Sequence, residues 1–270
     1  MKVIFLGTAS GAGKTTFSAM YCRYLAKNGV SVAPFKASNL SLNSKDVTGG
    51  RIGIGQALQA EASGIEPTTD MNPVLLEPLG KGQIRMYLNG IPHSEISDEN
   101  VMDIDEVTSE ACKAFDRLKD NFDAVICEGS GSPAEINMTD RDIANIGMMR
   151  ERNIPAVLIG DIERGGVFAA LYGTWKLMPD DLKGRVGGFA INRFRGDPSI
   201  LDSGIRRIEE LTGMKFLGLL PYMKLKLPEE DSLSENNEIL SDTIESLDAM
   251  IAKVEESGFD FNELKKIAEN

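Results

Sequence analysis

The sequence has 270 residues, of which 42% are hydrophobic, so it can bury one large core or two modest ones. Asp and Glu outnumber Lys and Arg by 41 to 29, and the resulting formal net charge of -12 disfavours nucleic acid as a partner. No apolar run reaches the roughly 18 residues that span a bilayer, and the three cysteines lack the spacing of a metal or redox site, so we expect a soluble, cytoplasmic protein with reduced thiols.

Short apolar runs alternate with longer amphipathic segments along the chain. This alternation predicts an α/β fold with a mostly parallel sheet and helices on both of its faces. The expected strands cover residues 2–6, 31–35, 124–127, 156–160, 188–191 and 216–220, and they are continuously apolar, as strands buried on both faces should be. The expected helices cover residues 14–27, 53–63, 105–118, 143–152, 167–177 and 199–211.

The most specific motif, GTASGAGKTT at residues 7–16, lies between the first strand and the first helix. The backbone N–H groups of such a turn bind phosphate, and the motif predicts a P-loop NTPase that binds ATP. Lys14 would contact the β and γ phosphates, and Thr15 would hold Mg²⁺ through its hydroxyl. Five residues rather than the usual four separate Gly7 from Gly13. The residues expected to contact ATP here are Thr8, Ser10, Gly11, Ala12, Gly13, Lys14, Thr15 and Thr16.

Polar residues follow the next two strands of the predicted sheet, where ligands of parallel α/β sheets bind. Lys36 begins a loop rich in amides and hydroxyls, and a lysine there can join a substrate carboxylate to the phosphoryl group. A solvated loop is the alternative for this segment. Glu128 is expected to be a second contact to Mg²⁺, with a structural carboxylate that caps a turn as the alternative.

Between these strands, residues 73–88 predict a small inserted hairpin, because strand-like pieces at 74–76 and 84–88 flank a Gly-Lys-Gly turn. Later in the chain, Asp161 and Arg164 precede paired glycines at a helix start, which fits an anion-binding corner; an internal ion pair of Arg164 would also explain the charges. Asn192 ends the fifth strand beside Arg193, and its amide can pair with an adenine edge, which is a weak signal by itself.

The chain becomes polar and acidic after Pro228, which indicates a linker, and one or two helices are expected over residues 242–268. We therefore predict a P-loop domain over residues 1–233 and a C-terminal helical extension, packed on it, over residues 234–270.

Taken together and in this order, these segments resemble the synthetase domain of the cobyric acid synthase family. The strings that carry the resemblance are PFKA at 34–37, SLNS at 41–44, QALQA at 56–60, DMNPVLL at 70–76, GSPAEIN at 131–137, RDIAN at 141–145, RGGVFA at 164–169 and LPEEDSL at 227–233. These strings are far more specific than the phosphate loop. The broader family includes dethiobiotin synthetase and cobyrinic acid a,c-diamide synthase.

The resemblance implies an ATP-dependent, amide-forming ligase. In that chemistry a carboxylate takes the γ-phosphate of ATP, and ammonia then displaces phosphate from the acyl phosphate. The implied acceptors are side-chain carboxylates of a corrinoid, from adenosylcobyrinic acid a,c-diamide to cobyric acid. Alternatives are the same chemistry on another tetrapyrrole or polycarboxylate, and a partitioning-type ATPase switch, although this class carries an additional lysine where the chain has Thr8 or Ala9.

The resemblance also implies roles for particular residues. The catalytic residues would be Lys14, Lys36 and Asp161. The further nucleotide contacts would be Asn192 and Arg193. The corrinoid contacts would be Lys36, Asn39, Ser41, Asn43, Ser130, Ser132 and Arg164. The Mg²⁺ ligands would be Thr15, Glu128 and Asp46, since Arg51 occupies the position at which the family carries an acidic residue and Asp46 is the nearest carboxylate.

A glutaminase domain with a Cys, His and Glu triad normally follows the synthetase domain in this family. The only histidine here, His93, is expected to lie in a surface loop, so such a triad cannot be assembled. We therefore expect ammonia from a separate glutaminase subunit or from solution, and we interpret the chain as a stand-alone subunit rather than a truncated one. A homodimer is expected by analogy.

Overall fold

The computed structural model of the chain describes residues 1–223 and 238–270. The linker predicted after Pro228, the boundary at 233/234 and the string at 227–233 lie outside the described residues. No helix in the described part of the chain is long and apolar enough to cross a membrane.

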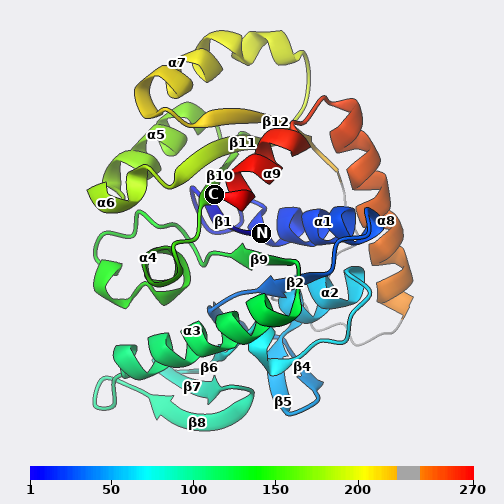
Figure 1. Ribbon diagram of the computed structural model, residues 1–270. Coiled ribbons are helices and arrows are strands. Elements are labelled where there is room, and N and C mark those ends of the chain that lie inside the picture. Colours follow the sequence, from blue (N-terminus) through cyan, green and yellow to red (C-terminus); the bar gives the residue numbers. More distant parts are fainter. Residues whose placement is uncertain (224–237) are drawn as a thin grey trace.

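A six-stranded sheet forms the centre of the molecule, with the strand order β12-β11-β10-β1-β9-β2 and every pair parallel (Figure 1). Its strands are β1 (Lys2–Gly7), β2 (Val32–Phe35), β9 (Ala124–Glu128), β10 (Ala156–Asp161), β11 (Val186–Phe194) and β12 (Lys215–Pro221). The central three are almost entirely buried, which explains why their sequences are continuously apolar. All six predicted strands are confirmed.

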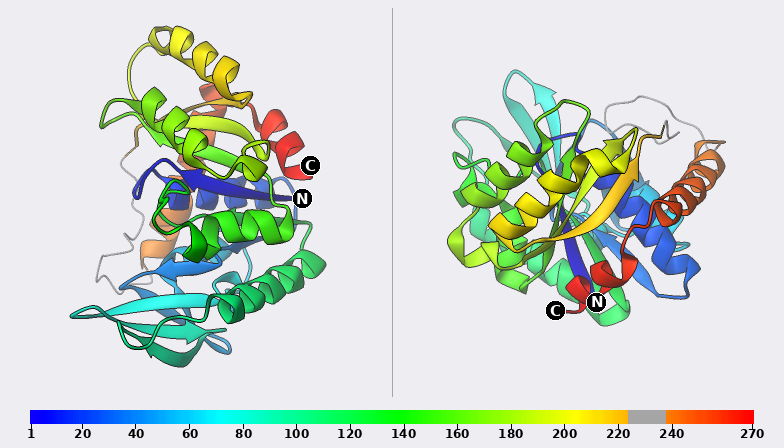
Figure 2. Two further views of the ribbon diagram at one scale, coloured as in Figure 1. Left: turned by 90° about the vertical axis from the view of Figure 1, so that its left-hand side faces the viewer. Right: turned by 90° about the horizontal axis from the view of Figure 1, so that it is seen from above.

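Helices cover both faces of this sheet (Figures 1 and 2). The core on one face is built with α1 (Lys14–Lys27), α8 (Glu238–Glu256) and α9 (Phe261–Glu269). The core on the other face is built with α3 (Ile104–Asn121), α4 (Met148–Arg152), α5 (Val167–Leu177) and α7 (Asp202–Thr212), and α6 (Asp180–Lys183) adds Leu182. Beyond strand β2, α2 (Ile54–Ala62) packs against α1.

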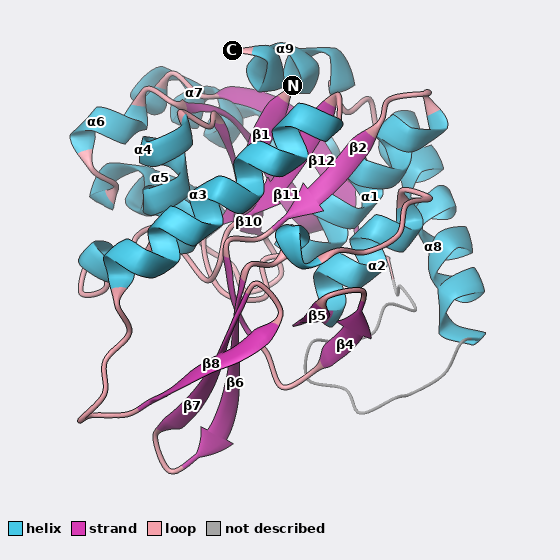
Figure 3. Ribbon diagram, turned by 60° about the horizontal axis from the view of Figure 1, so that its bottom comes forward, coloured by secondary structure: helices cyan, strands magenta, loops and turns pink. Residues whose placement is uncertain are grey.

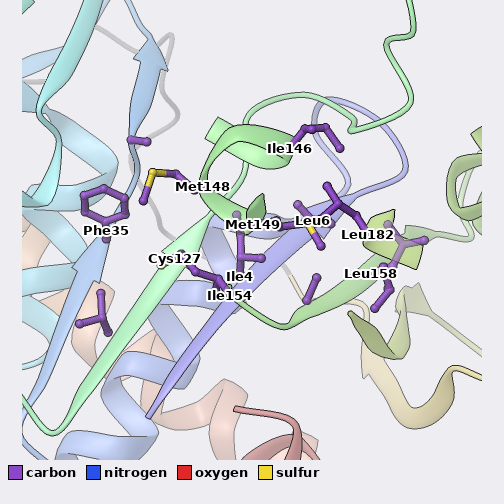
Figure 4. Packing of buried hydrophobic residues seen from close by; sticks show 14 of the residues in the cluster. Ile4, Leu6, Phe35, Cys127, Ile146, Met148, Met149, Ile154, Leu158 and Leu182 are labelled. Carbon is purple, nitrogen blue, oxygen red and sulfur yellow. The ribbon is translucent and has the colours of Figure 1, made fainter. Parts of the chain in front are cut away.

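Alternate residues of the same strand fill the two cores, because successive side chains of a strand point to opposite faces. On β1, Ile4 and Leu6 belong to the core built with α3, α4, α5 and α7, which we call the α3–α5 core. Figure 4 shows both residues among the side chains of this core. Val3 and Phe5 belong to the α1–α8–α9 core. The two cores therefore lie on opposite faces of the same central sheet. The chain length allowed one large core or two modest ones, and the structure has two.

Two small sheets lie beyond the carboxyl ends of the central strands (Figure 3). One has the order β3-β6-β7-β8, with β3 (Ser38–Leu40), β6 (Val74–Gly80), β7 (Gln83–Leu88) and β8 (Ile91–Ile96). The other pairs β4 (Ser44–Val47) with β5 (Gly50–Gly53). Lys81 and Gly82, between β6 and β7, both have positive φ, as a two-residue hairpin turn of type I′ requires.

The inserted hairpin is confirmed, because β6 and β7 pair antiparallel, and β8 and β3 extend it into a larger sheet. Two other predictions in this region are wrong in detail. His93 lies on strand β8 rather than in a loop. The loop expected after β2 forms β3 and, after it, β4.

Elsewhere, α1 and α5 have the predicted bounds. The helix predicted over residues 143–152 is instead a π-helical turn, Ile143–Gly147, followed by α4. Short 3-10 turns cover Thr69–Met71, Thr139–Arg141 and Pro198–Leu201. The last of these replaces the first turn of the helix predicted from residue 199.

Candidate active site

A cavity of about 1030 Å³ opens at the carboxyl ends of the central strands. The predicted residues that line it are Ser10, Gly11, Gly13, Lys14, Thr15, Thr16, Lys36, Asn39, Glu128, Ser130, Asn192 and Arg193. They come from the ends of four different strands and from the start of α1, so the parallel topology alone brings them together.

The phosphate loop is anchored from outside by Asn192, at the end of β11. The side-chain amide of Asn192 donates to the carbonyl of Ala12 at 2.9 Å, and its oxygen accepts from the backbone N–H of Arg193 at 2.8 Å. Gly13 has a φ of 101°, and a Cβ atom there would lie 2.0 Å from Nδ2 of Asn192. The glycine is thus required both by its backbone conformation and by this contact. The adenine role proposed for Asn192 stays a prediction.

Lys14 is held against the loop that follows β9. Its ammonium group donates to the carbonyl of Gly131 at 2.8 Å and to that of Ala9 at 3.3 Å. Asn145, in the π-helical turn, donates to the carbonyl of the adjacent Ser130 at 2.7 Å. Its amide is itself bonded to the carboxylate of Asp142 at 3.0 and 3.1 Å. The turn therefore fixes the loop that contacts Lys14, a role that the sequence analysis did not assign.

Glu128 lies at the end of β9 with only 1% of its side chain exposed, and three side chains donate to it. Oε1 accepts from Oγ1 of Thr15 at 2.7 Å and from Nζ of Lys36 at 2.9 Å. Oε2 accepts from Nε2 of Gln59, on α2, at 2.8 Å. We call these four residues the Glu128 cluster. Three members of this cluster, Thr15, Lys36 and Glu128, were predicted to act on the phosphate or the metal. The fourth, Gln59, was not predicted to be a site residue.

The surroundings of Glu128 favour its ionised form. Burial by itself would raise the pKa of Glu128, but the charge of Lys36 and hydrogen bonds from Lys36, Thr15 and Gln59 outweigh burial and lower that pKa. An ionised carboxylate beside a hydroxyl is a hard-oxygen donor pair.

These two oxygens suit Mg²⁺, which takes one or two protein ligands and completes its shell with phosphate oxygens and water. Thr15 lies in the first turn of α1, directly after Lys14, so a metal held there would lie next to bound phosphates. Within residues 1–223 and 238–270 there is no cluster of three or more His, Cys, Asp or Glu side chains suited to a metal. The donor set therefore fits a metal that is shared with a nucleotide.

The third predicted ligand, Asp46, does not line the cavity. It lies on strand β4, and its carboxylate pairs with Nε of Arg51, on β5, at 2.9 Å. The Asp46 side chain is 80% exposed. Arg51 occupies the position at which the family carries an acidic residue. It forms an ion pair with Asp46, the carboxylate that was expected to take over the metal role of that residue.

Lys36 is positioned by a residue that the sequence analysis did not single out. Asn72 is fully buried, and its side-chain amide donates to the carbonyl of Lys36 at 2.9 Å and to that of Val74 at 3.2 Å. Its oxygen accepts from the backbone N–H of Gly53 at 3.0 Å. One amide therefore ties together the segment after β2, β6 and the start of α2. In the sequence, only the position of Asn72 within the string at residues 70–76 pointed to this residue.

Charged residues at the ends of β10 and β11 form ion pairs with each other. Asp161 pairs with Nη1 of Arg193 at 2.6 Å, and Glu163 pairs with Nη2 of Arg195 at 2.8 Å. The guanidinium of Arg195 lies 3.4 Å from the ring centroid of Tyr222, which also lines the cavity. The expected alternative, an ion pair of Arg164, is replaced by these pairs, and Arg164 is exposed.

Several other predicted site residues do not line the cavity. These are Thr8, Ala12, Ser41, Asn43, Ser132, Asp161 and Arg164. Ala12 and Ser132 are buried, whereas Thr8 is partly exposed. Lining residues that the sequence analysis missed include Leu40, Leu58, Glu163, Tyr222, Met223 and Met250. Met250 comes from α8, far along the chain, and no motif marks it.

Residues 3–234 match the family model described as "CobQ/CobB/MinD/ParA nucleotide binding domain". The chain belongs to this family. The phosphate loop, the all-parallel sheet and the flanking helices are therefore those of a P-loop nucleotide-binding domain, as predicted from residues 7–16.

Curated relatives in this family are similar over most of the chain. The chain is 50% identical over 234 residues to a "Probable cobyric acid synthase" of Methanococcoides burtonii, which covers 86% of this chain and 47% of that protein. It is 48% identical over 236 residues to a protein of the same name from Methanoculleus marisnigri, with coverages of 87% and 48%. The chain thus spans about half the length of the curated relatives it matches.

Among solved structures, the MinC:MinD complex of Aquifex aeolicus aligns with 16% identity and a TM-score of 0.47, covering 93% of this chain and 96% of that one.

Proposed function

We propose that this chain catalyses ATP-dependent amide formation on carboxylates of a corrinoid, from adenosylcobyrinic acid a,c-diamide to cobyric acid. The observation that supports this most is the position of Lys36. It lies within hydrogen-bonding distance of Glu128, which in turn contacts Thr15 of the phosphate loop. A cation there can neutralise both a transferring phosphoryl group and an incoming carboxylate. The similarity to cobyric acid synthases supports the choice of acceptor.

The proposed reaction has two steps. A carboxylate oxygen of the acceptor attacks the γ-phosphorus of ATP, and the bond from that phosphorus to the oxygen of ADP breaks. Ammonia then attacks the acyl carbon, phosphate leaves, and a proton is released to give the amide. Bound Mg²⁺ would supply charge neutralisation on the phosphates, held by Thr15 and Glu128.

The protein's part is positioning and charge. Lys14 would leave the carbonyl of Gly131 to bind the phosphates, and Lys36 would hold the acceptor carboxylate in line with them. The cavity, of about 1030 Å³, is large enough for a nucleotide and the edge of an acceptor that carries the reacting carboxylate. Ammonia would come from a separate glutaminase or from solution.

The direct test incubates the chain with ATP, ammonium and cobyrinic acid a,c-diamide and follows the corrinoid by mass spectrometry. Each amidation replaces a hydroxyl with an amino group, so the mass should fall stepwise and ADP should form in equal amount. Nucleotide-dependent self-association without any amidation would instead support a switch of the partitioning type and would overturn the proposal.

Lys36→Met should separate binding from chemistry. We expect kcat for amidation to fall about 10²- to 10³-fold, as when one charge-stabilising donor is removed from a transition state. The affinity for ATP should change little, because Lys14 and the loop backbone remain. A variant that keeps the wild-type kcat would exclude Lys36 from the reaction.

A further inference from the structure

Gln59 is a buried polar residue for which the proposed reaction has no use so far. Its side chain is 0% exposed, and it lies on α2, whose other buried residues are mostly Ala, Leu and Gly. Within the described part of the chain, its Oε1 has no hydrogen-bond partner. Burying an unpaired carbonyl oxygen costs about 1–3 kcal/mol. A methionine of similar shape would avoid this cost, so the amide must be explained by what its other end, Nε2, contacts.

The Nε2 atom of Gln59 reaches both residues that would hold Mg²⁺. It donates to Oε2 of Glu128 at 2.8 Å and lies 3.4 Å from the backbone carbonyl of Thr15. The two carboxylate oxygens of Glu128 therefore have different hydrogen-bond partners. Oε2 is bound by Gln59, while Oε1 faces the hydroxyl of Thr15 and the ammonium of Lys36.

A carboxylate can turn about its last bond, since that torsion is broad. A donor fixed on one oxygen removes this freedom and leaves the other oxygen directed at the metal position. An amide is suited to this task because it is neutral: a second lysine would compete with the metal for the negative charge, whereas Gln59 only orients it.

On this geometry, and resting on the proposed function, we infer that Gln59 is a positioning residue that presents Oε1 of Glu128 to Mg²⁺. Gln59 itself is buried and does not line the cavity. Its removal should therefore raise the Mg²⁺ concentration that nucleotide binding needs, without affecting the contacts that the phosphate loop makes by itself.

Gln56 offers a matched control. It lies one turn earlier on α2, is also 0% exposed, and likewise has one unpaired atom, Nε2, within the described residues. Its Oε1 accepts from Nδ2 of Asn39 at 3.3 Å, and no contact with Glu128 is seen. Gln56→Met and Gln59→Met therefore remove similar groups from the same helix, and a purely structural role would make the two variants behave alike.

The experiment measures binding of a fluorescent, non-hydrolysable ATP analogue across a Mg²⁺ titration and again in EDTA, with melting temperatures recorded for each variant. For Gln59→Met we expect the Mg²⁺ concentration at half-maximal binding to rise about tenfold, as for loss of other groups that orient a metal ligand. Binding in EDTA should be unchanged. Gln56→Met should keep the wild-type Mg²⁺ dependence.

Gln59→Asn provides a second variant if Gln59→Met does not fold, because it keeps the amide but is one methylene too short to reach Glu128. It should show the same loss. Wild-type Mg²⁺ dependence in these Gln59 variants would overturn the inference and leave the proposed function standing. Binding by the unaltered protein that is the same with and without Mg²⁺ would overturn the inference together with the metal site of the proposed function.

Discussion

The Lys36–Glu128 pair is among the least exposed ion pairs of the described chain, with 4% and 1% of the two side chains accessible. Removing one partner of such a pair leaves a buried charge uncompensated, which destabilises a protein by about 3–5 kcal/mol. Removing both partners is far less harmful. The pair therefore has consequences for stability as well as for the reaction.

At this scale, Lys36→Met should lower the free energy of unfolding by about 3 kcal/mol at pH 7. The reason is that Thr15 and Gln59 can bond the Glu128 carboxylate but cannot neutralise it. The double variant with Glu128→Gln should recover a large part of that loss. Urea unfolding followed by circular dichroism measures both, and equal stabilities of the single and double variants would contradict the argument.

The three thiols should be almost inert in the folded protein. Burial raises the pKa of Cys22 to about 12 and also raises the pKa values of Cys112 and Cys127. At pH 8 only about one Cys22 in 10⁴ would be a thiolate, the form that reacts. We expect Ellman's reagent to modify all three thiols rapidly in denaturant and very slowly without it. Rapid native labelling would show that α1, α3 or β9, which carry these thiols, opens readily.

Among the elements, α8 depends on a small set of contacts with α1. Arg23 forms two hydrogen bonds to the carboxylate of Asp248, at 2.9 and 3.1 Å, and Lys27 adds a third at 3.2 Å. Leu247 and Met250 place the apolar side of α8 in the core. Because Met250 also lines the cavity, the docking of this helix bears on the site.

Asp248→Asn should weaken this docking in a pH-dependent way. The hydrogen bond from Arg23, with the nearby positive charges, lowers the pKa of Asp248 below its usual value. A lowered carboxyl pKa contributes stability above the unfolded value of about 3.9, and this contribution is lost as pH falls through the folded pKa. Since a third of the side chain is exposed, we expect a loss of at most about 1 kcal/mol at pH 7.

The measurement for this variant is thermal unfolding of both proteins between pH 7 and pH 3. The difference between them should shrink towards the acidic end. A difference that grows as pH falls would have the wrong sign and would contradict an ion-pair role for Asp248.

Elements with a long periodic pattern or a continuous apolar run were predictable from the sequence, and α1 is the clearest case. The π-helical turn at Ile143–Gly147 was not, because its apolar spacing also fits an α-helix. Two hydrogen bonds hold this turn: a local one from the backbone N–H of Asn145 to Asp142, and a tertiary one from the Asn145 side chain to the carbonyl of Ser130. Strands β3 to β5 were missed because they are three or four residues long and polar, so they have no alternation to read.

The same distinction applies to the cavity. Lys14 was found through the phosphate-loop motif, and Lys36 and Glu128 were found because each follows a recognisable strand and parallel strands end at one edge. Gln59 and Asn72 were missed as contributors because they act across the fold on residues far away in sequence. Their spacing within their own segments carries no information about those contacts.

For the whole molecule, the two cores are coupled because they share the central sheet. Residues of β1, β9 and β10 alternate between the two cores. If one core loses its packing, the strands that also support the other core are disrupted. Unfolding of the described chain should therefore be one cooperative event.

Phe17→Ala tests this coupling. Phe17, on α1, is fully buried in the α1–α8–α9 core, while Trp175, the only tryptophan, packs against the core on the opposite face. Truncating a buried Phe costs about 3–5 kcal/mol. We expect the Trp175 fluorescence transition in urea to move to lower concentration by the same amount as the circular dichroism transition. Two separated transitions would show that the cores unfold independently.

The position of Lys36 beside Glu128 has an electrostatic consequence for what can enter the cavity first. Among the described side chains that line the cavity, the three positive charges of Lys14, Lys36 and Arg193 exceed the two negative charges of Glu128 and Glu163, although the protein as a whole carries -12. A bare divalent cation would be repelled there, whereas a cation already complexed to a tetra-anionic triphosphate would be attracted. Calorimetric titration with MgCl₂ alone should accordingly give no saturable heat in the range that saturates the nucleotide complex, and a saturable signal would mean that the pocket accepts the ion by itself.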